Sequence, residues 1–157
     1  MTINEKGFVL NDKTVWPYVG LGTIDLVGDK GTFEILNALN SGFRLLDTST
    51  NYNNEGIVGE AVRRSKLHRE EILVSSKLPG SHHDYDKAFI FLQESLRRAG
   101  LEYFDKYLIH WPNPDDGKYV EAWKALVDAQ KQGLIRTIGV SNFCLLYTSD
   151  AADDTPC

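Results

Sequence analysis

The stretch FRLLDTSTNYNNEGIVGEAVRRSKLHREEILVSSK, residues 43–77, decides the fold of this chain. It opens with the short apolar run FRLLDTS and closes with a second one, EILVSSK, at residues 71–77. Between them, residues 54–65 place apolar side chains at helical spacing, and Asn54 is a residue type suited to an N-cap. Short apolar strands joined by a helix are typical of a parallel sheet covered by helices.

The same alternation continues toward the C-terminus. Helices are expected at residues 84–100 and 118–133, and strands at 104–110 and 136–142. In the first of these helices, the expected buried face consists of Ala88, Leu92, Ser95, Leu96 and Ala99. In the second, it consists of Tyr119, Trp123, Leu126, Val127 and Gln130.

Toward the N-terminus, three further elements are expected. The run GFVLNDKTV, residues 7–15, predicts a short hairpin around Asn11 and Asp12. The run YVGLGT follows as a strand, and a helix is expected over residues 31–40. The chain thus supplies a hairpin, about five parallel strands and four helices.

Two folds of this class compete: an open doubly wound sheet and a closed (β/α)8 barrel. The run GLGT is not a G-x-G-x-x-G fingerprint, which argues against dinucleotide binding of the doubly wound type. Successive strands end instead in polar, reactive residues, namely Asp47, Lys77, His110 and the pair Ser141-Asn142. Barrel enzymes build their active sites on that rim. Because such a barrel needs ~250 residues, the expected fold is an incomplete TIM barrel.

The overall composition is that of an ordinary globular protein: 42% hydrophobic and 25% charged residues, with a net charge of −5. No basic stripe indicates nucleic acid, and no apolar run approaches the ~18 residues of a membrane span. The first residues lack the pattern of a signal peptide. We therefore expect a cytoplasmic protein without nucleic-acid or membrane partners.

Asp47, Tyr52, Lys77 and His110 form a chemically coherent set. A phenol with a pKa near ~10 is a poor acid at neutral pH, but a nearby ammonium group lowers that pKa. A carboxylate keeps the ammonium charged, and a neutral imidazole can orient a substrate oxygen. Such a set suits protonation of a carbonyl oxygen as hydride reaches the carbon.

Each of these residues also has an ordinary structural explanation. Asp47 could cap a loop, and Tyr52 could be an exposed turn residue. Lys77 could be a solvated strand end or a Schiff-base lysine, and His110 could be a core histidine. The pair His82-His83 lacks companion ligands, so no metal site is expected.

Four stretches, GFRLLDTSTNYNNE, ILVSSKL, YLIHWPNP and GLIRTIGVSNF, closely resemble signature stretches of the aldo-keto reductases. The resemblance covers roughly residues 7–143, and the stretch LPGSHHDYDKA is similar to 2,5-diketogluconate reductase-type bacterial members. It implies NADPH-dependent reduction of a small carbonyl substrate by a monomeric barrel enzyme. An alternative is a regulatory or binding subunit of the same fold without turnover.

The resemblance also implies residue roles. Tyr52 would be the proton donor, Asp47 and Lys77 its tuning partners, and His110 the residue that orients the carbonyl. The implied cofactor contacts are Gly22, Thr23, Ile24, Asp47, Ser141 and Asn142. Ile24 and Trp111 would flank the substrate, although the family often has tryptophan where Ile24 stands.

The last residues, 144–157, depart from this pattern. They hold both cysteines, Cys144 and Cys157, and three of the acidic residues. A natural acidic tail and a short variant completed by oligomerisation are two interpretations. The stretch CLLYTSDAADD is also similar to the translation of a transposase adapter used in sequencing libraries. We expect residues 1–143 to be the N-terminal part of the barrel, residues 144–157 to be non-native, and the fragment alone to be inactive.

Overall fold

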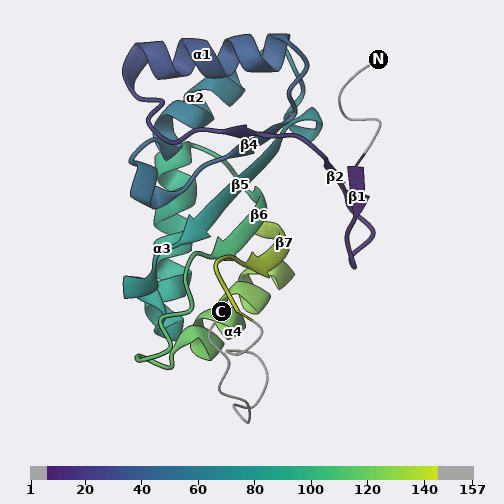
Figure 1. Cartoon of the computed structure of the whole chain (residues 1–157). Helices are drawn as coiled ribbons and strands as arrows, with labels where there is room; N and C mark the ends of the chain where they lie inside the picture. Colours follow the sequence, from purple (N-terminus) through teal and green to yellow (C-terminus); the bar gives the residue numbers. More distant parts are fainter. Residues whose placement is uncertain (1–6, 145–157) are drawn as a thin grey trace.

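The computed structural model describes residues 7–144 and shows the expected alternation of strands and helices (Figure 1). The elements are β1 (Gly7–Val9), β2 (Val15–Pro17), β3 (Leu21–Gly22), α1 (Gly28–Asn40), β4 (Leu45–Asp47), η2 (Thr50–Tyr52), α2 (Glu55–Arg64), η3 (Arg69–Glu71), β5 (Leu73–Leu78), η4 (Gly80–His82), α3 (Tyr85–Ala99), β6 (Phe104–Ile109), α4 (Tyr119–Lys131) and β7 (Ile135–Val140). The tail expected to be non-native lies outside the described residues, apart from Cys144.

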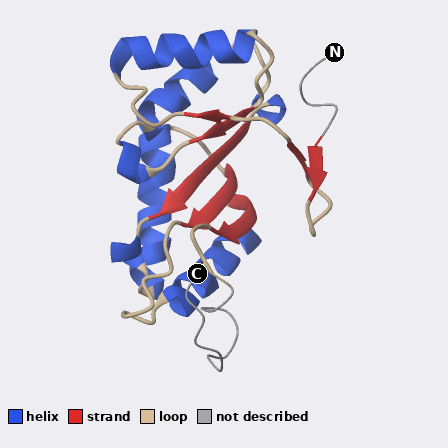
Figure 2. Ribbon diagram, viewed as in Figure 1, coloured by secondary structure: helices blue, strands red, loops and turns tan. Residues whose placement is uncertain are grey.

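The main sheet has five parallel strands in the order β3-β4-β5-β6-β7. Each strand therefore lies beside its neighbour in sequence, and the helices line one face of the sheet (Figure 2). This sequential order with helices on a single face is that of a (β/α)8 barrel wall. It confirms the predicted fold class, with its five parallel strands and four helices.

The core lies between the sheet and the helices. On β6, Tyr107 and Ile109 point into it and are buried, whereas Leu108 between them faces the opposite side of the sheet and is partly buried. The expected buried face of α3 is confirmed in full, because Ala88, Leu92, Ser95, Leu96 and Ala99 are all buried. Within residues 7–144, no helix is both long and apolar enough to cross a membrane.

The expected buried face of α4 is confirmed only at Leu126. The buried residues are Ala122, Ala125, Leu126 and Ala129, whereas Trp123 keeps 38% of its surface exposed. The prediction assumed that bulky side chains mark the buried face of the helix. The helix instead packs against α3, β6 and β7 through its alanines, which let the elements approach closely. The start of α1 also differs, since the helix begins at Gly28, before the apolar periodicity becomes visible.

The predicted N-terminal hairpin is confirmed, with β1 and β2 antiparallel and Phe8 opposite Trp16. It docks on strands near the end of the chain. The hydroxyl of Thr137 donates to Asp12 Oδ2 at 2.6 Å, and the Lys106 ammonium lies 4.2 Å from the Trp16 ring centroid. The hairpin is thereby attached to β6 and β7.

Candidate active site

The polar residues at the strand ends meet along one edge of the sheet. Asp47 is the last residue of β4, Lys77 lies near the end of β5, and His110 directly follows β6. Ser141 and Asn142 directly follow β7. Because the strands are parallel and paired in sequence order, these positions share the carboxyl edge.

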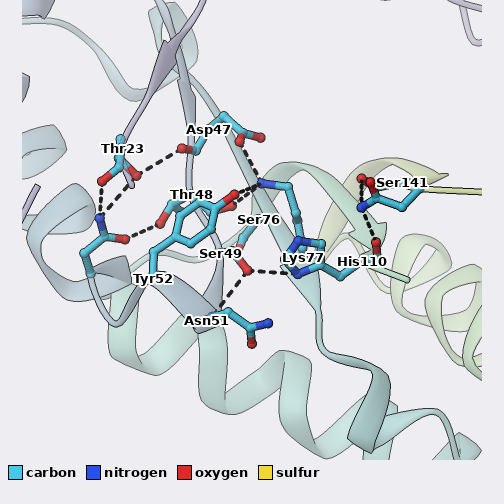
Figure 3. A network of polar contacts seen from close by, with 12 residues as sticks. Thr23, Asp47, Thr48, Ser49, Asn51, Tyr52, Ser76, Lys77, His110 and Ser141 are labelled. Atoms are coloured by element: carbon cyan, nitrogen blue, oxygen red, sulfur yellow. Dashed lines mark hydrogen bonds and ion pairs between the residues drawn. The ribbon is translucent and has the colours of Figure 1, made fainter. Parts of the chain in front are cut away.

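Lys77 is the centre of this group (Figure 3). Its Nζ donates to Asp47 Oδ2 at 2.7 Å, to the Thr48 carbonyl oxygen at 2.9 Å and to Tyr52 Oη at 3.3 Å. The side chain is only 7% exposed. An ammonium group has three donors, and here each has an acceptor. The geometry therefore favours a charged lysine held against both a carboxylate and a phenol.

Tyr52 is placed by the short helix η2. Ser49 caps this helix, with its Oγ accepting the Asn51 N–H at 3.3 Å. Asn53 then ends it in a left-handed conformation, with φ of 53°. The phenol is thereby turned toward Lys77, whose Nζ lies 4.9 Å from the Tyr52 ring centroid. This arrangement can stabilise the phenolate that remains after the phenol gives up its proton.

His110 lies beside the phenol, with the two rings edge to face and their centroids 6.4 Å apart. Burial lowers the pKa of His110, and the nearby Lys77 ammonium lowers it further, while Asp47 partly offsets both effects. Burial and the Lys77 charge therefore both favour the neutral form of the imidazole. Trp111 packs next to it, with ring centroids 6.0 Å apart, and is 50% exposed.

Asn54 shows a role that the sequence did not reveal. It directly precedes α2 as predicted, but its side chain makes no capping hydrogen bond. Its Nδ2 instead donates to the carbonyl oxygens of Thr23, at 2.5 Å, and Leu26, at 3.1 Å, while its Oδ1 accepts from Thr48 Oγ1 at 2.7 Å. The loop after β3 needs donors for these carbonyl groups, and the fully buried Asn54 supplies them. It thus connects that loop to the Tyr52 loop.

Glu55 is a second residue that sequence reasoning missed. Its carboxylate, only 2% exposed, accepts hydrogen bonds from Ser76 Oγ at 2.6 Å, from Arg98 Nε at 3.0 Å and from Ser95 Oγ. Ser76 immediately precedes Lys77 in β5. Glu55 therefore fastens the segment after Tyr52 to β5 and α3. The signal in the sequence that could have indicated this role is the run of polar residues leading to Glu55, which lies between two apolar elements.

The remaining predicted residues differ in exposure. Gly22 and Ile24 are exposed, and a Cβ added to Gly22 would meet no atom of residues 7–144 within 4 Å. Thr23 is buried, and its hydroxyl donates to the Asp47 carbonyl oxygen at 3.0 Å. Asn142 has a left-handed φ of 60°, and its Nδ2 donates to the His110 carbonyl oxygen at 2.8 Å.

The histidine pair after β5 is not part of a metal centre in the described region. Between residues 7 and 144, no three His, Cys, Asp or Glu side chains gather closely enough to hold a metal ion. His82 Nδ1 lies 2.9 Å from Ser81 Oγ, whereas His83 is 2% exposed and neither of its ring nitrogens has a partner among the described residues.

Comparison with known proteins gives consistent matches. The model of the Aldo/keto reductase family matches residues 19–155. A 2,5-diketo-D-gluconic acid reductase B from Corynebacterium is 45% identical over 146 residues, which make up 93% of this chain and 53% of that protein. The chain thus spans about half the length of such relatives.

Solved structures agree. An aldo/keto reductase from Brucella melitensis superimposes with a TM-score of 0.86 at 34% identity, covering 90% of this chain and 56% of that one. A Bombyx mori aldo-keto reductase in complex with NADP gives a TM-score of 0.81 at 34% identity, with coverage of 97% and 56%.

Proposed function

Because the chain belongs to the aldo/keto reductase family, we propose that it acts in the NADPH-dependent reduction of an aldehyde or ketone to an alcohol. One observation carries the proposal. The Lys77 ammonium contacts the Asp47 carboxylate at 2.7 Å and the Tyr52 phenol at 3.3 Å at the same time. This is the geometry of a general acid with a partner that stabilises its conjugate base.

In the proposed reaction, Tyr52 transfers its phenolic proton to the carbonyl oxygen. The resulting phenolate is stabilised by the Lys77 ammonium, and Asp47 holds that ammonium in place. The neutral His110 orients the carbonyl oxygen by hydrogen bonding. A nicotinamide cofactor supplies the hydride to the carbonyl carbon when bound.

The rim residues suit a planar amide-bearing group. Ser141 and Asn142 place a hydroxyl and a carboxamide beside the His110 backbone, where they would hold the nicotinamide carboxamide. The open space above Gly22 allows a flat ring to approach the backbone. The NADP-bound relative from Bombyx mori supports a nicotinamide cofactor.

Thr23 and Ile24 complete the turn at the nicotinamide end, and Asp47 would also touch the ribose. Ile24 and Trp111, 59% and 50% exposed, are proposed to flank the substrate. The name of the corynebacterial relative suggests a keto-sugar acid as one candidate substrate.

The Schiff-base alternative for Lys77 is less well supported. Attack on a carbonyl requires a neutral amine, whereas three acceptors surround this Nζ and favour the ammonium form. A binding subunit without turnover stays the alternative that an experiment has to separate.

A chimera tests the proposal. Residues 1–143 are joined to the C-terminal half of the corynebacterial relative, and carbonyl-dependent oxidation of NADPH is followed by absorbance. We expect turnover that Tyr52→Phe lowers by about 100-fold or more, because proton transfer contributes at least that factor. Tyr18→Phe is the matched control, since Tyr18 is an exposed tyrosine in the N-terminal segment.

Two results would contradict the proposal. One is equal turnover in the Tyr52→Phe chimera, which would exclude the general acid. The other is NADPH binding without turnover, which would favour the binding subunit. We propose further that residues 1–143 form the N-terminal part of a barrel and that the 157-residue chain alone has little activity. Robust turnover by that chain would refute the second statement.

A further inference from the structure

Ser49 contacts Nδ1 of His110, the ring nitrogen that does not face the carbonyl oxygen in the proposed reaction. It is fully buried at the start of η2, and its Oγ lies 3.4 Å from His110 Nδ1, a long hydrogen bond (Figure 3). Within residues 7–144, this is the single side-chain hydrogen bond of the imidazole. The other ring nitrogen, Nε2, has no partner there.

The direction of this hydrogen bond follows from the second contact of Ser49. Its Oγ accepts the Asn51 backbone N–H at 3.3 Å, and an N–H group can only donate. Within the described chain, Nδ1 is then the remaining polar atom within reach of the hydroxyl hydrogen. A buried hydroxyl without an acceptor is destabilising, so the Ser49 O–H donates to Nδ1.

We propose that Ser49 is a positioning residue that holds neutral His110 in the tautomer with its proton on Nε2. A neutral imidazole that accepts at Nδ1 must carry its proton on Nε2. Only the consequence of this tautomer rests on the proposed function, in which Nε2 would donate a hydrogen bond to a carbonyl oxygen. The tautomer itself is a property of this chain.

The charges around the ring agree with a neutral imidazole. The Lys77 ammonium opposes a second positive charge and, with burial, lowers the pKa of His110, while the Asp47 carboxylate acts in the other direction. The hydrogen bond from Ser49 adds to this, because an imidazolium has a proton on Nδ1 and cannot accept it.

The test is ¹⁵N NMR of the histidine rings in the 157-residue chain, which has four histidines. The ¹⁵N shifts separate a protonated ring nitrogen from an unprotonated one, and His110→Gln assigns the signals. We expect an unprotonated Nδ1 and a protonated Nε2 in the wild type. In Ser49→Ala, loss of the hydrogen bond should shift the tautomer ratio about fivefold toward Nδ1–H, and Ser49→Thr should restore the wild-type signals.

The chain offers a matched control. Ser81→Ala removes a similar contact at 2.9 Å between Ser81 Oγ and His82 Nδ1, which is an exposed pair, and should leave the His110 signals unchanged. Ser49→Gly is a second variant without a hydroxyl. A protonated Nδ1 in the wild type overturns the proposal, as do unchanged His110 signals in the hydroxyl-free variants. If Ser49→Ala and Ser49→Gly both fail to fold, the wild-type and Ser49→Thr spectra still decide whether His110 Nδ1 is unprotonated. Since no turnover is measured, failure here is distinct from failure of the reductase proposal.

Discussion

Lys77 illustrates what fixes a single residue in this site. A lysine is normally exposed, yet this one is 7% exposed because an acceptor meets each of its three donors. Two of those acceptors, Asp47 and Tyr52, were identifiable from their types and positions. The third, the backbone carbonyl of Thr48, was not, because a sequence shows no backbone geometry.

His83 gives a prediction at this scale. Burial lowers its pKa, the carboxylates of Asp116 and Asp84 partly offset this effect, and His82 adds to it. A histidine with a lowered folded-state pKa leaves stability intact above its unfolded pKa of ~6.5 and reduces it as the pH falls. We expect His83→Leu to lose less stability than the wild type between about pH 7 and about pH 5, measured as urea midpoints.

The control for this prediction is His82→Gln, because His82 is more exposed and its Nδ1 contacts Ser81 Oγ. This variant should keep most of the acid sensitivity of the wild type, because His82 makes the smallest contribution to the lowered pKa of His83. Equal pH dependence in His83→Leu and the wild type would show that the buried imidazole does not limit acid stability.

Residue-level prediction from the sequence had a clear boundary. The strand-end positions of Asp47, Lys77 and His110 could be predicted, because strand ends and residue types can be recognised in a sequence. The roles of Asn54 and Glu55 were not, because their partners lie in other elements and depend on packing. Asn54 was expected to cap α2, but the carbonyl groups of a distant loop compete for its amide.

At the scale of elements, α4 shows how small residues set a packing face. Ala125 is fully buried where α4 packs, whereas Lys124 is exposed. Ala125→Leu should destabilise the fold by about 1–3 kcal/mol, because added methylenes in a packed core force neighbours apart. Denaturant unfolding measures the change in free energy.

Lys124→Leu adds a leucine to the same helix on its outer side and should change the free energy of unfolding by about 0.5 kcal/mol or less. A larger loss for Lys124→Leu than for Ala125→Leu would contradict the packing of α4 through Ala125. The strand–helix alternation was predictable from periodicity. The buried face of α4 was not predictable, because alanine side chains are small and contribute little to a hydrophobic pattern.

At the scale of the whole molecule, the described sheet has two edges, β3 and β7. An unpaired edge offers N–H and C=O groups to another chain. We expect the 157-residue chain to associate increasingly as its concentration rises, as measured by sedimentation. Val140→Lys, at the exposed end of β7, should weaken the association, because a charge on an edge strand disfavours pairing.

The matched control is Val120→Lys, on an exposed valine of α4. It should associate as the wild type does. A chain that stays monomeric at every concentration, or equal effects of both lysines, would argue against pairing through β7.

The hydrogen bond between Asp12 and Thr137 also leads us to expect an order of events in folding. The two residues are 125 positions apart, so this contact closes nearly the whole described chain. During synthesis the hairpin leaves the ribosome before its docking strands β6 and β7. Contacts of such long sequence separation form slowly, because the entropy of closing the loop is lost before the contact stabilises the fold. We therefore expect the hairpin strands β1 and β2 to dock later than the local strand and helix pairs form.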